Sequence, residues 1–258
     1  MARKKAMIIH DEHSEPTSVV TNERQRKVVA RPTKLKIDQL ETFDPLTENQ
    51  KKFFDAYKKQ EYFIALHGVA GTGKSFIAMY KALEEVLDKG TPFDKVIIVR
   101  SAVPSREVGH LPGTLEEKTD IYTQPYIQIC HTLFGRSDAY EMLVNQDNIE
   151  FVSTSFIRGM TFDDCIIIVD EMQNMTFEEI DTVMTRVGSR SKIIWCGDYR
   201  QTDLNKKKND MSGILKFFEI AELMGDFTKI EFTPEDIVRS SLVKDYILAK
   251  LDYEDKSE

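Results

Sequence analysis

The sequence predicts an α/β fold in which helices cover both faces of a parallel sheet. The prediction rests on three largely apolar runs, at residues 62–66, 164–169 and 192–197, which lead into glycine or charged residues. Strands that are apolar on both sides are typical of parallel sheets whose two faces are buried. Helix signals lie between the runs, as expected of strand–helix–strand units.

The N-terminal half supplies the first elements of this pattern. A helix is expected at residues 47–59, with Thr47 as its N-cap and Gln50 as the capping-box partner. The apolar residues 76–83 predict a buried helix after the first strand. Residues 95–100 predict the next strand, because they form a short apolar run between polar segments.

The C-terminal half continues the alternation. A helix is expected at residues 176–187, where Thr176 is followed three residues later by Glu179. Residues 229–232 predict a last strand. The pair Thr233-Pro234 follows it, and a threonine cap with proline at the first helical position predicts another helix start.

A phosphate-binding loop lies between the first strand and the helix after it. The stretch from Gly68 to Ser75 fits the pattern G-x-x-x-x-G-K-[ST]. Glycines let the backbone approach a phosphate closely, and the helix N-terminus adds positive partial charge. Lys74 is expected to reach the β- and γ-phosphates, and the Ser75 hydroxyl to join the shell of Mg²⁺. The predicted nucleotide-binding residues of the loop are Gly68, Val69, Ala70, Gly71, Thr72, Gly73, Lys74 and Ser75.

Two carboxylates, Asp170 and Glu171, end the second apolar run. Ligands of open parallel sheets bind beyond the carboxyl ends of the strands, where the phosphate-binding loop also opens. Asp170 is therefore the candidate metal ligand, acting through a water molecule. Glu171 is the candidate base that orients or deprotonates the attacking water. A carboxylate pair at this place favours hydrolysis over transfer to a small-molecule acceptor.

The third apolar run leads to Gln201, a neutral side chain that can bond both a γ-phosphate and the attacking water. Taken alone, the Gly197-Asp198 pair before it would indicate an ordinary turn. Its place after two other phosphate-facing strand ends favours a sensor role for Gln201.

These residues resemble the PhoH-like proteins, whose ATPase core is similar to the N-terminal core of superfamily 1 helicases. The resemblance implies a P-loop NTPase fold of the RecA/helicase-like type and ATP hydrolysis with Mg²⁺. It also implies that Gln50 reads the adenine edge. The segments that carry the resemblance are residues 46–50, 68–75, 99–104, 109–118, 157–161, 169–176, 185–188, 197–204 and 236–239.

The expected domain organisation follows from this resemblance and from the charge distribution. Residues 1–44 are expected to be a basic, largely flexible tail, residues 45–250 the ATPase domain, and residues 251–258 an acidic tail. The net charge of −8 weighs against a protein that simply coats nucleic acid. No apolar run is long enough for a membrane helix and no signal region opens the sequence, so we expect a cytoplasmic protein. The three cysteines are expected to be reduced packing residues.

The choice of base and the expected assembly complete the prediction. The guanine-specifying pattern Asn-Lys-x-Asp is absent, because the stretch Asn205–Lys208 has lysine in place of the aspartate. ATP is therefore preferred.

The sequence after Glu171 is shorter than a second α/β core, which takes roughly 100–150 residues. An arginine from a neighbouring copy is then expected at the γ-phosphate, with Arg239 ahead of Arg186, and a homo-oligomeric ring, a hexamer, would supply it.

Two classes of function stay open at this point. One is a ring ATPase that acts on RNA or single-stranded nucleic acid, as the helicase-like segments indicate. The other is an ATP-dependent switch that acts on protein partners, which the acidic body of the chain favours. Stimulation of ATP hydrolysis by single-stranded RNA distinguishes the two.

Overall fold

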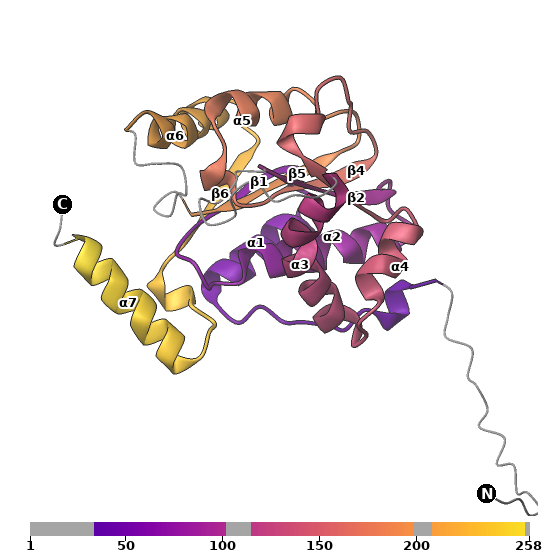
Figure 1. Ribbon diagram of the computed structural model, residues 1–258, viewed down its shortest axis with the longest axis horizontal. Helices are drawn as coiled ribbons and strands as arrows, with labels where there is room; N and C mark the ends of the chain where they lie inside the picture. The colour runs from indigo at the N-terminus through magenta and orange to yellow at the C-terminus, as the bar shows by residue number, and fades with distance from the viewer. Residues whose placement is uncertain (1–33, 102–114, 199–207, 256–258) are drawn as a thin grey trace, which may run out of the picture. The chain divides into compact units, whose positions relative to one another are not determined.

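The computed structural model describes residues 34–101, 115–198 and 208–255. Within these ranges six strands form one sheet, in the order β3-β2-β4-β5-β1-β6 (Figure 1). Every pair of neighbouring strands is parallel. The predicted parallel α/β fold is therefore confirmed. The strands are β1 (Phe63–Gly68), β2 (Lys95–Arg100), β3 (Ile149–Ser153), β4 (Cys165–Val169), β5 (Lys192–Gly197) and β6 (Phe227–Phe232).

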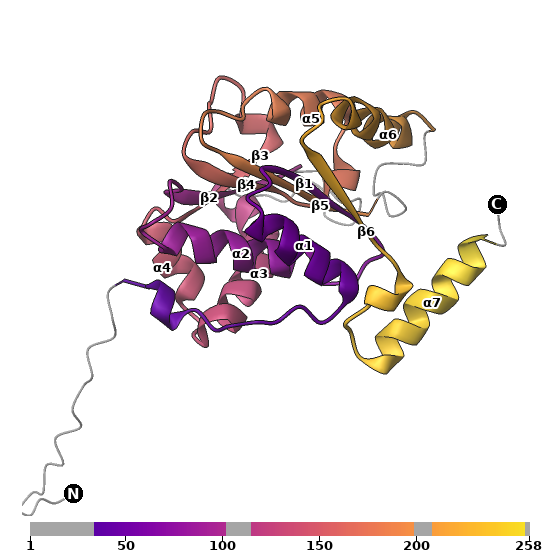
Figure 2. The ribbon, with the colours of Figure 1, turned by 180° about the vertical axis from the view of Figure 1, so that it is seen from behind.

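Helices cover both faces of the sheet, which Figures 1 and 2 show from opposite sides. One face packs against α1 (Glu48–Lys58), α2 (Lys74–Leu87), α3 (Leu115–Phe134) and α4 (Ala139–Asn145). The other face packs against α5 (Phe177–Met184) and α6 (Lys208–Glu222). Successive strand residues alternate between the two cores: Ile166 and Ile168 face α2, whereas Ile167 and Val169 face α5 and α6. This alternation explains why the strands are apolar throughout.

The strand register brings three predicted strand ends together. Leu66 of β1 is paired with Cys196 of β5, and Ile168 of β4 is paired with Ile194 of the same strand. The segments that follow β1, β4 and β5 therefore leave the same edge of the sheet. These segments carry the phosphate-binding loop, the carboxylate pair and Asp198.

Helix α5 is anchored to the ends of β2 and β3 by the side chain of Glu179. The predicted capping box is present, since Thr176 accepts from the backbone N–H of Glu179 and Glu179 accepts from that of Thr176 at 2.9 Å. The other carboxylate oxygen accepts from the hydroxyls of Ser101 and Thr154, at 2.9 and 2.5 Å. Glu179, the predicted capping-box partner of Thr176, thus also joins α5 to the ends of β2 and β3.

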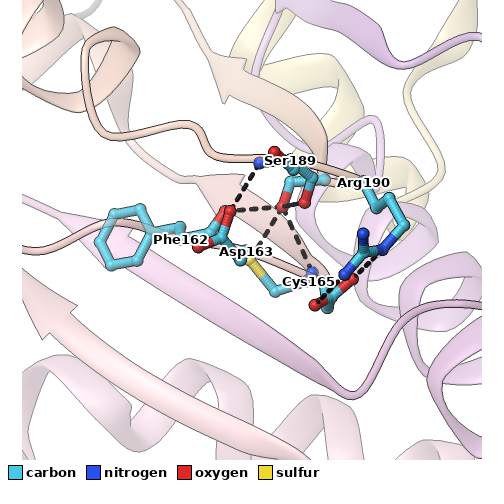
Figure 3. Close-up of polar contacts among 7 residues, drawn as sticks. Phe162, Asp163, Cys165, Ser189 and Arg190 are labelled. Carbon is cyan, nitrogen blue, oxygen red and sulfur yellow. Dashed lines mark hydrogen bonds and ion pairs between the residues drawn. The ribbon is translucent and has the colours of Figure 1, made fainter.

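Polar contacts fix the loops at the opposite edge, where β4 and β5 begin (Figure 3). The Asp163 carboxylate accepts from the backbone N–H of Ser189 at 2.6 Å, and Asp164 forms an ion pair with Arg190. A Cβ on Gly188 would lie 2.2 Å from the Asp163 carboxylate, so this tight approach requires glycine. These contacts set where the two central strands start.

The folded domain begins before residue 45. Leu35 is buried in the core, and the short 3₁₀ helix η1 (Ile37–Gln39) follows it. The backbone N–H of Glu41 donates to the carbonyl of Leu133 in α3 at 2.8 Å. Residues 35–44, which the sequence assigned to the flexible tail, therefore pack on the domain, and residues 1–33 lie outside the described part.

Five elements were not predicted from the sequence: β3, α3, α4, α6 and α7 (Ser241–Asp255). In α3 the obstacle is Pro125, which lies inside the helix and removes one backbone donor. Tertiary packing overrides this cost, because Tyr126, Cys130 and Leu133 on the same helix are fully buried. Within the described ranges, no helix combines the length and apolar character that crossing a bilayer would need.

Candidate nucleotide-binding site

The phosphate-binding loop has the backbone that its glycines predict. Gly68, Gly71 and Gly73 all have positive φ, at 115°, 77° and 82°. A Cβ on Gly68 would lie 2.1 Å from the carbonyl oxygen of Phe232, so β6 can approach only a glycine here. Helix α2 begins at Lys74, directly after the left-handed Gly73. The N-terminal end of α2 therefore opens at the loop, which is the arrangement that binds anions.

The ammonium group of Lys74 lies within the loop and is almost completely buried. Its Nζ donates to the carbonyls of Gly68 and Val69 at 2.9 and 2.8 Å. A third contact, at 3.3 Å, joins it to the hydroxyl of Thr72. Burial lowers the pKa of Lys74, while the charge of Asp198 acts in the opposite direction. The loop thus holds a cation at the place where the sequence predicts phosphates.

The hydroxyl of Ser75 joins the loop to the carboxylate pair. It donates to Oδ1 of Asp170 at 2.7 Å. The other oxygen of Asp170 accepts from the hydroxyl of Tyr126 in α3 at 2.8 Å. Burial, and next the charge of Asp170, raise the pKa of Tyr126 well above its usual range, which keeps the hydroxyl a donor. Both oxygens of the buried Asp170 carboxylate are therefore oriented.

Glu171 follows in a left-handed conformation, with φ of 54°, which is uncommon for a residue other than glycine. Burial raises the pKa of its carboxyl group, and the nearby charge of Asp170 adds to this. The side-chain amide of Gln173 donates to Glu171, and its carbonyl accepts from the backbone N–H of Asp198 at 3.0 Å. Gln173 thus links the segment after β4 to the segment after β5.

Gln50 contacts the loop, although its side chain does not complete the predicted capping box. Thr47 does cap α1, because it accepts from the backbone N–H of Gln50 at 3.3 Å. The Gln50 side chain instead accepts from the backbone N–H of Leu46 at 2.8 Å and donates to the carbonyl of Thr72 at 2.9 Å. The reciprocal contact to the backbone N–H of Thr47 is absent because the side-chain oxygen of Gln50 accepts from Leu46 instead.

The segment after β6 packs on the same loop of its own chain. The backbone N–H of Val238 donates to the carbonyl of Gly71 at 3.1 Å. A Cβ on Gly71 would lie 3.1 Å from Cγ of Arg239 and 3.3 Å from Cδ1 of Ile247 in α7. The sequence placed Arg239 at a neighbouring copy's site. The stem of Arg239 lies beside the phosphate-binding loop of its own chain, and the role of its guanidinium group at either site stays a prediction.

Asp236 holds this segment against α1. Its carboxylate accepts from the side-chain amide of Asn49 at 2.6 Å and from the backbone N–H of Thr233 at 2.9 Å. Burial alone would raise the pKa of Asp236, but hydrogen bonds from Thr47, Asn49 and Thr233 lower it below its usual value. The 3₁₀ helix η4 (Pro234–Asp236) begins at the predicted Thr233-Pro234 pair.

Two sequence candidates remain, Gln201 and Arg186. Gln201 lies outside the described residues. Arg186 lies in the turn after α5, and its carbonyl accepts from the backbone N–H of Phe162, near the start of β4. It therefore lies at the edge of the sheet opposite to the phosphate-binding loop.

Three residues of the site were not among the predicted site residues: Arg100, Tyr126 and Gln173. Arg100 ends β2, lies over the ring of Tyr122 at 5.6 Å, and its charge counteracts the raised pKa of Glu171. The sequence could have indicated both Arg100 and Gln173. Arg100 is the last residue of β2, and Gln173 follows the carboxylate pair after β4. No sequence signal exists for Tyr126, which lies in the middle of a helix.

Comparison with known proteins gives consistent matches. A family model described as "PhoH-like protein" matches residues 42–250. A PhoH-like protein of Mycobacterium leprae is 34% identical over 215 residues, which are 83% of this chain and 60% of that protein. A PhoH-like protein of Bacillus subtilis is 35% identical over 204 residues, 79% of this chain and 62% of that protein. The chain thus spans about three fifths of the length of these relatives.

Among solved structures, the large terminase of a thermophilic bacteriophage is similar with a TM-score of 0.47 and 11% identity. The similarity covers 79% of this chain and 50% of the terminase chain.

Proposed function

The chain belongs to the PhoH-like protein family, and from this membership and the geometry of its site we propose that it hydrolyses ATP with Mg²⁺. One observation carries the proposal. The hydroxyl that ends the phosphate-binding loop donates to the first carboxylate after β4, at 2.7 Å between Ser75 Oγ and Asp170 Oδ1. This pairing joins a phosphate site to an acidic site that can hold a metal.

The residues around Ser75 suit magnesium. When Ser75 donates its proton to Asp170, the lone pairs of its oxygen are free to face a cation. Mg²⁺ prefers oxygen ligands and is usually held by one or two protein groups together with phosphates and water. In keeping with this, no group of three or more His, Cys, Asp or Glu side chains forms a metal cage in the described residues. Ser75 and Asp170 would hold Mg²⁺, which would neutralise negative charge that develops on the phosphates.

Glu171 is our candidate for the group that orients or deprotonates the attacking water. Its raised pKa, caused first by burial, makes it a better proton acceptor than an exposed carboxylate. Gln173 would hold the Glu171 carboxylate by its amide hydrogen bond. Gln201 stays a candidate phosphate sensor, and Arg239 a candidate cation for the γ-phosphate.

ATP is the proposed nucleotide. Gln50 lies against the phosphate-binding loop, and a short shift of its amide toward a base would keep the Thr47 cap intact, since that cap uses the backbone of Gln50. The resemblance to helicase cores supports an adenine contact at this glutamine.

RNA or single-stranded nucleic acid is the proposed partner, and the helicase-like sequence segments support it. The second candidate is a switch that acts on protein partners, which the net charge of −8 favours. Purified protein should be assayed for ATP hydrolysis with Mg²⁺ or EDTA, and with or without single-stranded RNA. Hydrolysis that requires Mg²⁺ and rises several-fold with RNA is expected. Hydrolysis that RNA leaves unchanged would favour the switch, and no hydrolysis under any condition would contradict the proposal.

A homo-oligomeric ring, with a hexamer as the expected form, is part of the proposal. The described residues contain one sheet, so we expect residues 237–247 or another copy to cover the open side of a bound nucleotide. Light scattering with and without ATP tests assembly directly, and a monomer in both conditions would remove the ring from the proposal.

A further inference from the structure

Tyr126 lies outside the phosphate-binding loop, in α3, and its hydroxyl donates to the carboxylate of Asp170. Its hydroxyl lies 2.8 Å from Oδ2, whereas Ser75 lies 2.7 Å from Oδ1. The two donors therefore hold opposite oxygens of one carboxylate. Rotation of the carboxylate about its terminal bond would break both contacts, so the pair fixes the plane of the group.

The tyrosine is itself held rigidly. Its side chain is fully buried, and its ring lies 6.0 Å from the ring of Phe151 in β3. Cys130 and Leu133, one and two turns further along α3, are also fully buried in the same core. A side chain packed on all sides cannot follow the carboxylate if it turns, so α3 provides a fixed support for Asp170.

Such a support matters for a metal site. Partners that orient a ligand from behind are typically worth 10- to 100-fold in metal affinity. Here the support would act on the orientation of Asp170, and through the Ser75 hydroxyl on the direction of the lone pairs of Ser75.

We propose that Tyr126 is a positioning residue that sets the affinity of this site for Mg²⁺ with nucleotide, without contacting either. The inference rests on the proposed function, because it needs Asp170 and Ser75 to face the metal. It predicts a defect confined to the metal-dependent part of nucleotide binding.

The test is calorimetric titration of the full chain with the non-hydrolysable analogue AMPPNP, once with Mg²⁺ and once with EDTA. The Kd in EDTA divided by the Kd in Mg²⁺ measures how strongly the metal supports binding. In Tyr126→Phe this ratio should fall about 10-fold or more, and Kd in EDTA should stay unchanged. Tyr57→Phe is the matched control: it removes another buried tyrosine hydroxyl beside a carboxylate, that of Glu85, away from the loop. It should change neither value.

The outcomes distinguish a failure of the positioning role of Tyr126 from a failure of the proposed function. If the unmutated protein shows the metal effect and Tyr126→Phe keeps it in full, the positioning role is wrong and the proposed function stands. An equal loss of affinity in Mg²⁺ and in EDTA would also overturn the role, because it would indicate a general packing defect. If the unmutated protein binds no analogue, or binds it without a metal effect, the proposed function fails and the inference fails with it.

A thermal melt of each variant verifies its fold. Should Tyr126→Phe melt below the assay temperature, 4-fluorophenylalanine at position 126 fills the space of the hydroxyl without donating a hydrogen bond. The same fall in the ratio is expected for it, and an unchanged ratio would overturn the proposal.

Discussion

Ser75 and Asp170 are 95 residues apart in the sequence, and the hydroxyl of Ser75 lies 2.7 Å from the carboxylate of Asp170. The parallel sheet brings them together, because β1 and β4 both pair with β5 and end at the same edge. The fold itself therefore sets this pairing. The following predictions test how each part of this site contributes.

Replacement of Lys74 by alanine should weaken nucleotide binding strongly. The change removes the only charged group that the described loop directs at the phosphates, and it also removes the hydrogen bonds to the carbonyls of Gly68 and Val69. Affinity for a fluorescent ATP analogue measures the effect. Lys81→Ala, on the same helix but paired with Glu84, is the control and should bind normally. Equal affinity in the two variants would contradict the assignment of the loop.

Replacement of Glu171 by glutamine should leave binding almost intact and lower turnover by about a hundredfold or more, because only the proton-accepting oxygen is lost. Steady-state hydrolysis and analogue affinity are measured on the same protein. Glu178→Gln changes a carboxylate in the first turn of α5, outside the site, and should have no effect. Turnover near the normal rate in Glu171→Gln would remove this residue from the mechanism.

Arg239→Ala should lower turnover, and mixing it with Glu171→Gln should restore little activity. The stem of Arg239 packs beside Gly71 of its own chain, so each mixed site would still carry one defect. The assay is ATP hydrolysis after mixing, in particles shown to exchange subunits. Clear recovery on mixing would instead show that Arg239 serves the site of a neighbouring copy, as the sequence alone suggested.

Lys192→Met should destabilise the fold by roughly 3–5 kcal/mol, because it breaks a buried ion pair and leaves the Glu85 charge without its partner. The Nζ of Lys192 lies 2.8 Å from Glu85 and 3.6 Å from the centre of the Tyr57 ring, with the lysine side chain fully buried. Urea unfolding measures the loss.

Two further variants control the Lys192 result. A second change, Glu85→Met, should recover most of the stability, since neither charge is then left unpaired. Lys229→Met breaks an exposed pair with Glu222 and should cost about 1 kcal/mol or less. A loss for Lys192→Met no larger than that for Lys229→Met would rule out a structural role for the buried pair.

The three cysteines should not react with a thiol reagent at pH 8 until the protein unfolds. All three are buried and free. Burial raises the pKa of Cys130 to about 12 and that of Cys165 to about 11, and it raises the pKa of Cys196 well above its usual value. Because the thiolate is the reactive form, almost none is present at pH 8. Rapid labelling of the native protein would contradict the observed burial.

The sequence by itself determined the parallel fold, the central strands of the sheet and the segments that meet at one edge of it. Strands β1, β2, β4 and β5 were predictable because they are apolar on both faces and end in glycine or charged residues. Those endings also located the loop, Asp170 and Glu171, since the carboxyl ends of parallel strands share one edge. The caps at Thr47 and Thr176 were likewise local, each needing one turn of chain.

Only the tertiary structure decided which more distant side chains meet at this edge. Tyr126 donates to Asp170 across 44 residues of sequence, and Gln50 to the carbonyl of Thr72 across 22. Residue spacing indicates which face of a helix is buried, but the direction of a single polar group depends on its partner in another element. For the same reason the sequence did not indicate that the stem of Arg239 packs beside Gly71. Its position is set by the packing of residues 237–247 on Gly71, and glycine leaves room for that packing because it has no side chain.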